Sequence, residues 1–255
     1  MALITITSDL GKRDFYLGAL KGAILSNCGN VPIVDITHSI KPFDIKEAAF
    51  TVRNAARFFP KGTIHIVHVN STDGKDKLLV SVVDGHYYIT FDSGFLSLAF
   101  ERTPPQTYEV NEELTENASL MFEDAIGKVV NLLVKEFNPT DFAHLATQTI
   151  NYRLMQPIIN QGSIRGTIVN IDNYGNGIVN ITKAMFDQFI TGQRLSLMAN
   201  VGSSREISKK YSDVDEGEMV CLFNAAGYLE IAINNGKAEN LLGLKIDSPV
   251  LIMLD

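Results

Sequence analysis

The sequence predicts two domains: an N-terminal α/β domain with a largely parallel sheet, and a smaller C-terminal all-β domain of barrel type. The first prediction rests on residues 1–150, where apolar strand-like runs alternate with amphipathic helical patterns. The second rests on residues 163–255, where short strand-like segments are separated by Gly, Asn, Asp and Ser. Residues 151–162 contain a proline and show no clear period, so we expect a linker there.

The elements of both halves follow from local patterns. Asp44 is a predicted N-cap, Gly29 a predicted helix end, and Asp84-Gly85 a predicted hairpin turn. In the N-terminal half, strands are predicted over residues 3–8, 31–37, 63–69, 77–83 and 86–91, and helices over residues 14–27, 43–59 and 123–137. In the C-terminal half, strands are predicted over residues 164–172, 177–182, 194–199, 219–224, 228–233 and 248–254.

Composition excludes several classes of protein. The net charge of −7 argues against a general binder of nucleic acid or anionic membranes. Cys28 and Cys221 are the two cysteines, which is neither a disulfide framework nor a zinc pattern, and no metal is expected. The start of the sequence lacks the features of a signal peptide, and no apolar run reaches roughly 18 residues. The cytoplasm is therefore the expected location.

Two polar residues follow predicted strands of the N-terminal half. Asp9 comes directly after the first strand, where its carboxylate would either bind a vicinal diol such as a ribose or cap the following helix; the residues alone favour neither. Asn70 follows the third strand and shares a face with His68. His68 would be either a base or a hydrogen-bonded structural histidine, and the second is favoured. In open α/β sheets, ligands bind where strands end.

Two further corners have both a structural and a functional interpretation. His38 follows the second strand as an ordinary loop histidine or a catalyst, and Phe43 would either cover an apolar ligand or staple the next helix. In "NIDNYGNGIVNI", Asp172, Tyr174 and Asn176 form either a tight hairpin or a surface that stacks on and reads a nucleobase. These corners do not by themselves predict a reaction.

Five blocks of the sequence, in order, resemble the S-adenosylmethionine (SAM) hydrolase family, the SAM hydroxide adenosyltransferases, which are related to the SAM-dependent fluorinase and chlorinase. The blocks are "ITSDLGKRDFYLGALKGAIL", "IVDITHSIKPFDIKEAAFTVRNAARFFPKGTIHI", "TFDSGFLSLAFE", "NIDNYGNGIVNI" and "FNAAGYLEIAINNGKA". The resemblance implies an α/β domain joined to a β-barrel, a homotrimer, and SAM bound between the N-domain of one subunit and the C-domain of its neighbour. It implies SAM as a substrate, adenosine as a product, and no separate cofactor.

The resemblance also implies roles for individual residues. Asp9 would bind the ribose diol, and Phe43 would line the pocket near the sugar and the sulfonium. The remaining substrate-binding candidates, which would contact the adenine or the methionine part of SAM, are Thr72, Asp172, Tyr174, Asn176, Tyr211, Ala226 and Asn234.

The family's polar Asp/Arg/His set differs in this chain. Asn70, Lys77 and Met121 stand at those three positions, and Asp73 or Asp76 is a candidate to replace the missing carboxylate. Because an amide orients water but is no useful general base, we expect slow hydrolysis, and losing such assistance typically costs about 10²–10⁴-fold in rate. The alternatives are a non-catalytic binder of SAM or adenosine, or an enzyme that uses another nucleophile or nucleoside. Halogenation is not expected, because Asn70 and Phe122 offer no hydroxyl.

Overall fold

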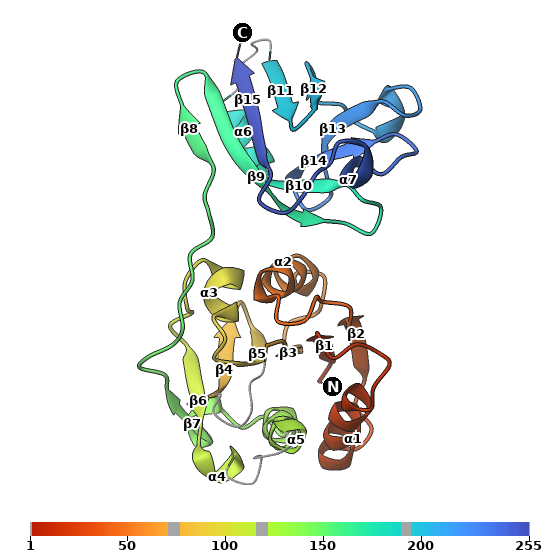
Figure 1. The fold of residues 1–255 in the computed structure, drawn as a ribbon. Helices are drawn as coiled ribbons and strands as arrows, with labels where there is room; N and C mark the ends of the chain where they lie inside the picture. The colour runs from red at the N-terminus through yellow and green to blue at the C-terminus, as the bar shows by residue number, and fades with distance from the viewer. Residues whose placement is uncertain (1, 71–76, 116–121, 190–194, 255) are drawn as a thin grey trace. The chain divides into compact units, whose positions relative to one another are not determined.

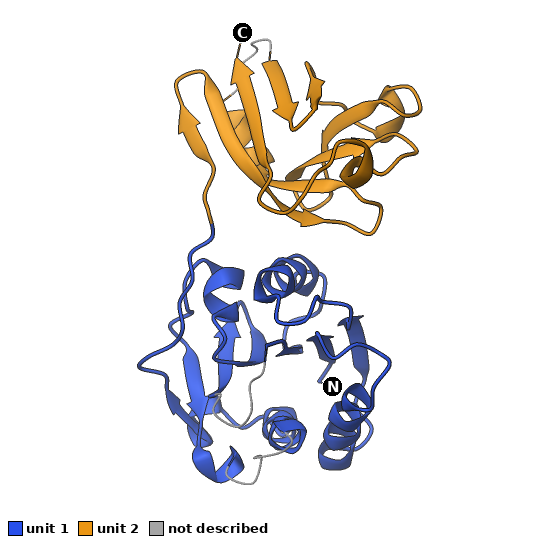
Figure 2. Ribbon diagram, in the orientation of Figure 1, with its two compact units in different colours: residues 1–154 blue, residues 155–255 orange. Residues whose placement is uncertain are grey.

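The computed structural model describes residues 2–70, 77–115, 122–189 and 195–254 (Figure 1). The chain divides into two compact units, residues 1–154 and 155–255 (Figure 2). The boundary between them falls inside the segment for which the sequence predicts a linker. Residues Thr72, Asp73, Asp76 and Met121, for which the sequence predicts roles, lie outside the described residues.

The first unit is built on a mixed sheet in the order β2-β1-β3-β5-β4-β6-β7. Strands β2, β1, β3 and β5 are parallel, whereas β4, β6 and β7 pair in antiparallel fashion. The α/β prediction is confirmed, with the parallel arrangement confined to the half in which strands and helices alternate. The strands are β1 (Ile4–Ser8), β2 (Ile33–Thr37), β3 (Ile64–His68), β4 (Leu78–Val83), β5 (His86–Phe91), β6 (Thr107–Val110) and β7 (Ala143–Leu145).

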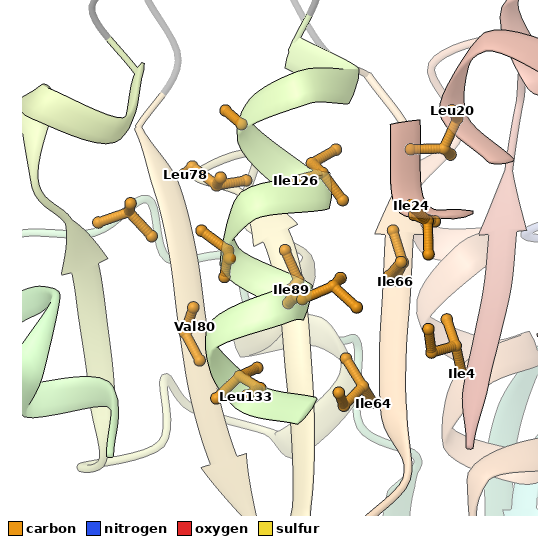
Figure 3. Packing of buried hydrophobic residues seen from close by; sticks show 14 of the residues in the cluster. Ile4, Leu20, Ile24, Ile64, Ile66, Leu78, Val80, Ile89, Ile126 and Leu133 are labelled. Carbon is orange, nitrogen blue, oxygen red and sulfur yellow. The ribbon is translucent and has the colours of Figure 1, made fainter. Parts of the chain in front are cut away.

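Helices cover both faces of this sheet. Ile64 and Ile66 of β3 lie in a core shared with α1 and α5, shown in Figure 3, and Val67 and Val69 lie in a core shared with α2 and α3. Burying one such side chain contributes roughly 1.5–3 kcal/mol, so these two cores hold the layers together. The helices are α1 (Tyr16–Cys28), α2 (Ile45–Ala56), α3 (Phe95–Phe100), α4 (Glu112–Thr115) and α5 (Phe122–Val134).

Local signals fix several boundaries. Asp44 caps α2 by accepting a hydrogen bond from the Glu47 amide at 2.9 Å, as predicted. Asp84 and Gly85 have φ values of 50° and 80°, which suits the tight β4–β5 hairpin that the sequence predicts. This hairpin reverses the chain, so β4 begins at the edge of the sheet where β1, β2, β3 and β5 end. We call this edge the carboxyl edge.

Helices α1 and α5 approach each other closely at Gly127. A Cβ atom at that position would lie 2.7 Å from the carbonyl oxygen of Ala23 and 2.9 Å from Nδ2 of Asn27. Both distances are shorter than a carbon atom tolerates, so only glycine fits between these backbones. The close contact at Gly127 thereby sets the distance between α1 and α5.

The second unit is an antiparallel, nearly closed sheet, as the sequence predicts. Its described strands follow the order β12-β11-β15-β9-β10-β14-β13, with β8 added beside β9. The two end strands, β12 and β13, also contact each other, which curves the sheet into a barrel around an apolar core. The strands are β8 (Ile158–Asn160), β9 (Ser163–Ile171), β10 (Gly177–Thr182), β11 (Leu195–Ala199), β12 (Gly202–Ser204), β13 (Met219–Phe223), β14 (Tyr228–Ile233) and β15 (Pro249–Leu254).

The second unit is not purely β-structure. Two short helices that the sequence pattern did not predict, α6 (Lys183–Phe189) and α7 (Ala238–Leu241), join its strands. Phe186 of α6 and Ala238 of α7 are buried in the barrel core, which explains why short polar-looking connections are ordered as helices. No helix in the described part of the chain has the length and apolarity needed to span a bilayer.

A histidine pair is buried on the α2 side of the first sheet. His65 is 0% exposed; its Nδ1 lies 2.7 Å from Thr5 Oγ1 and its Nε2 lies 3.3 Å from His86 Nδ1. The ring also stacks on Tyr88 with a centroid distance of 4.9 Å. Burial, followed by the proximity of His86, lowers the pKa of His65 from 6.5 to about 4. The folded protein therefore holds His65 neutral.

We expect this histidine to make folding stability depend on pH. The unfolded chain takes up a proton near pH 6.5, whereas the folded chain resists it until about pH 4, so stability is complete above 6.5 and falls as the pH drops towards 4. The shift corresponds to about 3 kcal/mol. Urea unfolding of wild type and of His65→Gln should therefore differ most at neutral pH, and the difference should shrink in acid. His144→Gln, which removes an exposed histidine, serves as the control; a gap for His65→Gln that does not change with pH would contradict the assignment.

Candidate functional site

The carboxyl edge of the first sheet gathers the predicted polar residues. Asp9 follows β1, Asn70 follows β3, and Lys77 directly precedes β4. Phe43 lies in the segment between β2 and α2. Because parallel strands end at one edge, residues far apart in the sequence meet here, at the position where open α/β sheets bind ligands.

The Asp9 carboxylate joins three segments of this edge. Its Oδ2 atom accepts hydrogen bonds from the backbone N–H of Phe43 at 2.9 Å and from the backbone N–H of Asn70 at 3.2 Å. The Asp9 amide donates to the His68 carbonyl at 3.3 Å. Helix α1 begins only after Phe15, so the alternative that Asp9 caps this helix is wrong. Within the described residues, Oδ1 of Asp9 accepts no hydrogen bond.

Both residues that donate to Asp9 have an uncommon backbone conformation. Phe43 has a φ of 68° and Asn70 a φ of 55°, in the left-handed region that non-glycine residues rarely occupy. Each such residue costs of order 1 kcal/mol, and such costs cluster at ligand sites, where a carboxylate or a ligand holds the backbone in place. The Phe43 side chain is 67% exposed, which does not fit a staple buried against α2 and leaves its ring free to cover a ligand.

His38 is a structural residue of this edge. It is 1% exposed, and its Nδ1 lies 2.8 Å from Ser8 Oγ. Its Nε2 lies 3.1 Å from Asp35 Oδ1, at ion-pair distance but without hydrogen-bond alignment. Burial raises the pKa of Asp35, but the hydrogen bond from Lys21 and the contact with His38 outweigh it, so that pKa lies below its usual value. With Ser8 fully buried, this chain of polar groups fixes the ends of β1 and β2 and offers no accessible nucleophile.

Lys77 is engaged in an ion pair. Its Nζ lies 2.7 Å from Glu109 Oε2 on β6, and the same oxygen lies 3.9 Å from His144 Nε2. The hydrogen bond to Glu109 raises the pKa of Lys77, so the ammonium stays charged. The structure therefore directs this cation towards Glu109, and its predicted effect on a reaction at Asn70 stays a prediction.

In the second unit, Asp172 organises the turn between β9 and β10. Its Oδ1 accepts hydrogen bonds from the amides of Tyr174 and Asn176, both at 2.9 Å, and its Oδ2 accepts one from Asn176 Nδ2 at 3.1 Å. Gly175, with a φ of 83°, closes the turn. The tight-hairpin interpretation is confirmed. This turn leaves Tyr174 75% exposed, as a face on which a flat ligand can stack.

Tyr211 and Glu230 lie beside this turn. Tyr211 Oη donates a 2.7 Å hydrogen bond to Glu230 Oε1, and Glu230 is 3% exposed. Burial, then this hydrogen bond and the negative charges of Glu230 and Asp172, raise the pKa of Tyr211. Sequence reasoning missed Glu230; the signal was a carboxylate in the centre of the apolar strand "YLEIAI". The structure thus brings Asp172, Tyr174, Tyr211 and Glu230 into one cluster.

The other predicted residues of the second unit hold the chain together. The Ala226 amide donates to Asn224 Oδ1 at 3.0 Å. The Asn234 amide donates to the Glu218 carbonyl at 3.0 Å, and Asn234 Nδ2 donates to the Val214 carbonyl at 2.8 Å. The backbone N–H groups of Ala226 and Asn234 are therefore both engaged within the unit, and their predicted contact with adenine or methionine stays a prediction.

Metal and thiol chemistry find no support in the described part of the chain. There, no group of three or more His, Cys, Asp or Glu side chains is arranged to hold a metal ion. Both cysteines are free; burial raises the pKa of the Cys221 thiol to about 12, and also raises that of Cys28. Thiols with raised pKa values are poor nucleophiles at neutral pH.

Two family models match the chain unit by unit. The SAM hydroxide adenosyltransferase N-terminal domain matches residues 4–142, and the corresponding C-terminal domain matches residues 166–251. The chain belongs to the SAM hydroxide adenosyltransferase family. The N-terminal match includes Asp9, Phe43 and Asn70 of the carboxyl edge, and the C-terminal match includes the Asp172 turn.

Similar proteins include members with assigned activities. The (R)-S-adenosyl-L-methionine hydrolase of Thermus thermophilus is 23% identical over 99% of this chain and 100% of its own length. The enzyme of the same name from Methanocaldococcus jannaschii is 25% identical over 95% and 92%. A fluorinase from an Actinoplanes species is 25% identical over 91% of each chain.

Solved structures share the fold of this SAM hydroxide adenosyltransferase family member. The crystal structure of an uncharacterized conserved protein from Thermotoga maritima has a TM-score of 0.87 and 23% identity, covering 99% of this chain and 100% of that one. A conserved hypothetical protein from Thermus thermophilus has a TM-score of 0.78 and 22% identity, with complete coverage of both chains. This likeness supports the arrangement of an α/β unit followed by a barrel.

The Tyr211–Glu230 pair should contribute to the stability of the second unit. Tyr211→Phe removes the donor and leaves Glu230 Oε1 buried without it, which we expect to lower the free energy of unfolding by about 1–3 kcal/mol. Tyr174→Phe makes the same chemical change at an exposed ring and should stay within about 0.5 kcal/mol of wild type. Chemical denaturation measures both. Equal effects of the two substitutions would show that the buried pair contributes nothing.

Proposed function

We propose that this protein hydrolyses S-adenosylmethionine to adenosine and methionine, with water attacking C5′ in line with the departing sulfur. Family membership and the names of the Thermus and Methanocaldococcus relatives support this reaction. The observation that carries the proposal is the Asp9 carboxylate. Two backbone N–H groups fix its Oδ2, which leaves Oδ1 to accept hydrogen bonds from the 2′- and 3′-hydroxyls of a ribose.

The chemistry requires little from the protein. Methionine leaves as a neutral thioether and needs no proton, so alignment of water and exclusion of other solvent are the main tasks. In this proposal Asn70 orients the water, Lys77 adds positive charge near the site, and Asp73 is a candidate to accept a proton. Phe43 covers the sugar and the sulfonium with its exposed ring. No metal or cofactor enters the mechanism.

The second unit would supply the other half of the binding site. The exposed rings of Tyr174 and Tyr211 are proposed to stack on the adenine, and Asp172 and Asn176 to contact adenine or the methionine amine. Thr72 and the backbone near Ala226 and Asn234 complete the proposed contacts. We further propose a cytoplasmic homotrimer in which the first unit of one subunit and the second unit of its neighbour share each site, with no nucleic-acid or membrane partner.

A second function has a specific observation in its favour. Asn70 cannot act as a general base, and the Lys77 ammonium is held by Glu109 at 2.7 Å. A site with a complete ribose-binding carboxylate but weak acid–base machinery also suits a protein that binds SAM or adenosine without turning it over. The two functions differ in whether adenosine and methionine are formed from SAM.

Incubation of purified protein with SAM decides between them. We expect adenosine and methionine to form in equal amounts, measured by chromatography, at a rate proportional to protein concentration and above a no-protein control. No adenosine at stoichiometric protein, together with SAM binding by calorimetry, would exclude hydrolysis and establish the binder.

Asp9→Ala tests the ribose assignment independently of turnover. Hydrogen bonds to a charged group are worth about 1.5–3 kcal/mol, so we expect adenosine to bind about 10- to 100-fold more weakly to this variant. Wild type should also prefer adenosine to 2′-deoxyadenosine, and Asp9→Ala should lose that preference. Calorimetry with both nucleosides measures this, with Asp187→Ala, an exposed aspartate of α6, as the control for charge. An undiminished preference in Asp9→Ala would refute the assignment.

A further inference from the structure

Two buried ionisable side chains beside the carboxyl edge have no part in the mechanism above. His68, the last residue of β3, is 4% exposed, and Glu123, in the first turn of α5, is 6% exposed. Burying a histidine and a carboxylate disfavours the charged form of each unless they are paired or hydrogen-bonded. His68 lies two residues before Asn70, and Glu123 belongs to the helix that packs on the same face of the sheet, so both are candidates for a role in the proposed reaction.

The fold brings these two side chains to the same place. His68 lies on the face of β3 that carries Ile64 and Ile66, which pack beneath α5. In Figure 3, Leu133 of α5 lies level with Ile64 of β3, whereas Ile126 lies on the side towards Ile66. Residue numbers therefore increase in opposite directions along α5 and β3. The first turn of α5 consequently lies over the end of β3. Glu123 is therefore carried to the end of β3 where His68 lies.

An aromatic side chain packs against the imidazole ring of His68. The His68 and Phe91 rings pack edge-to-face with their centroids 5.1 Å apart. Phe91 and Phe122 pack edge-to-face as well, with a centroid distance of 4.9 Å. Within the described residues, Nδ1 of His68 is buried and makes no hydrogen bond. A buried, unpartnered ring nitrogen is uncommon and calls for an explanation, because it usually costs stability.

The charges around His68 suit a base that becomes a cation during turnover. Burial lowers its pKa, so the ring is neutral at pH 7, while the negative charges of Glu123 and Asp9 act in the opposite direction. These two are the charged groups that face His68 in the described structure, from α5 and from the loop after β1. The negative charges of these two carboxylates let the buried imidazole gain a proton more easily than it would without them.

From this arrangement we infer that His68, in place of the candidate Asp73, is the proton acceptor for the attacking water and that Glu123 is the positioning residue that stabilises its protonated form. The inference rests on the proposed hydrolysis. The water oxygen forms a bond to C5′ as the C5′–sulfur bond breaks, and the sulfur keeps the electron pair of that bond. The proton released by water passes to the His68 imidazole, either directly or through a second water. Solvent removes it after the products leave.

The test is the pH dependence of kcat for adenosine formation between about pH 5 and pH 9. For wild type, kcat rises with pH through an inflection below the ordinary histidine value of 6.5. His68→Gln lowers kcat about 10²-fold or more and removes that inflection while SAM affinity is unchanged. Glu123→Gln retains the inflection but moves it to lower pH, because the imidazolium has lost its negative partner. His144→Gln, at an exposed histidine of β7, behaves as wild type.

The outcomes separate this inference from the proposed function. If wild type forms no adenosine, hydrolysis is refuted and the role of His68 is refuted with it. If wild type forms adenosine and His68→Gln keeps both its rate and its inflection, only the inference on His68 is overturned. Should His68→Gln not fold, the shift in Glu123→Gln decides, together with NMR titration of the His68 ring in wild type and in that variant. An unmoved His68 titration would refute the pairing.

Discussion

The carboxylate of Asp9 is the interaction on which the carboxyl edge of the first unit depends. One oxygen atom accepts the backbone N–H groups of Phe43 and Asn70, residues that are 34 and 61 positions away in the chain. The end of β1, the segment before α2 and the segment after β3 are therefore held by a single charged group. Both donors adopt left-handed backbone conformations, which a strong, charge-assisted hydrogen bond can sustain. The geometry of the remaining oxygen follows from this arrangement.

Elements whose signals are local could be predicted from the sequence. Asp44 caps α2 and Asp84-Gly85 turns the β4–β5 hairpin, because each acts on residues within a few positions of itself. The short helices α6 and α7 could not be predicted, since their apolar residues are too few to show a period. They form because the barrel core buries Phe186 and Ala238, which is a tertiary effect.

The position of the candidate site could be predicted from the sequence, but the hydrogen bonds and ion pairs between its residues could not. That Asp9 and Asn70 meet follows from parallel strands ending at one edge. The hydrogen bond from the Asn70 backbone to Asp9 does not follow from this rule, because the distance between the two groups depends on the backbone conformation after β3. Lys77 points to Glu109 because β4 pairs with β6, with Leu79 opposite Glu109, a partner that the sequence pattern did not identify. The role of buried Glu230 could not be predicted, because the alternation of a strand does not indicate that the Tyr211 hydroxyl will bind its carboxylate.

Gly127 lies about one helical turn after Glu123 on α5, and the carbonyl oxygen of Ala23 leaves no room for a side chain there. A larger residue would push α5 away from α1 and move its first turn, which carries Glu123. A substitution at position 127 would therefore change the distance between Glu123 and His68, and with it the electrostatic potential at His68, without altering any charged residue. Differences in rate between homologues can arise from helix spacing as well as from the chemistry of the side chains that line a site.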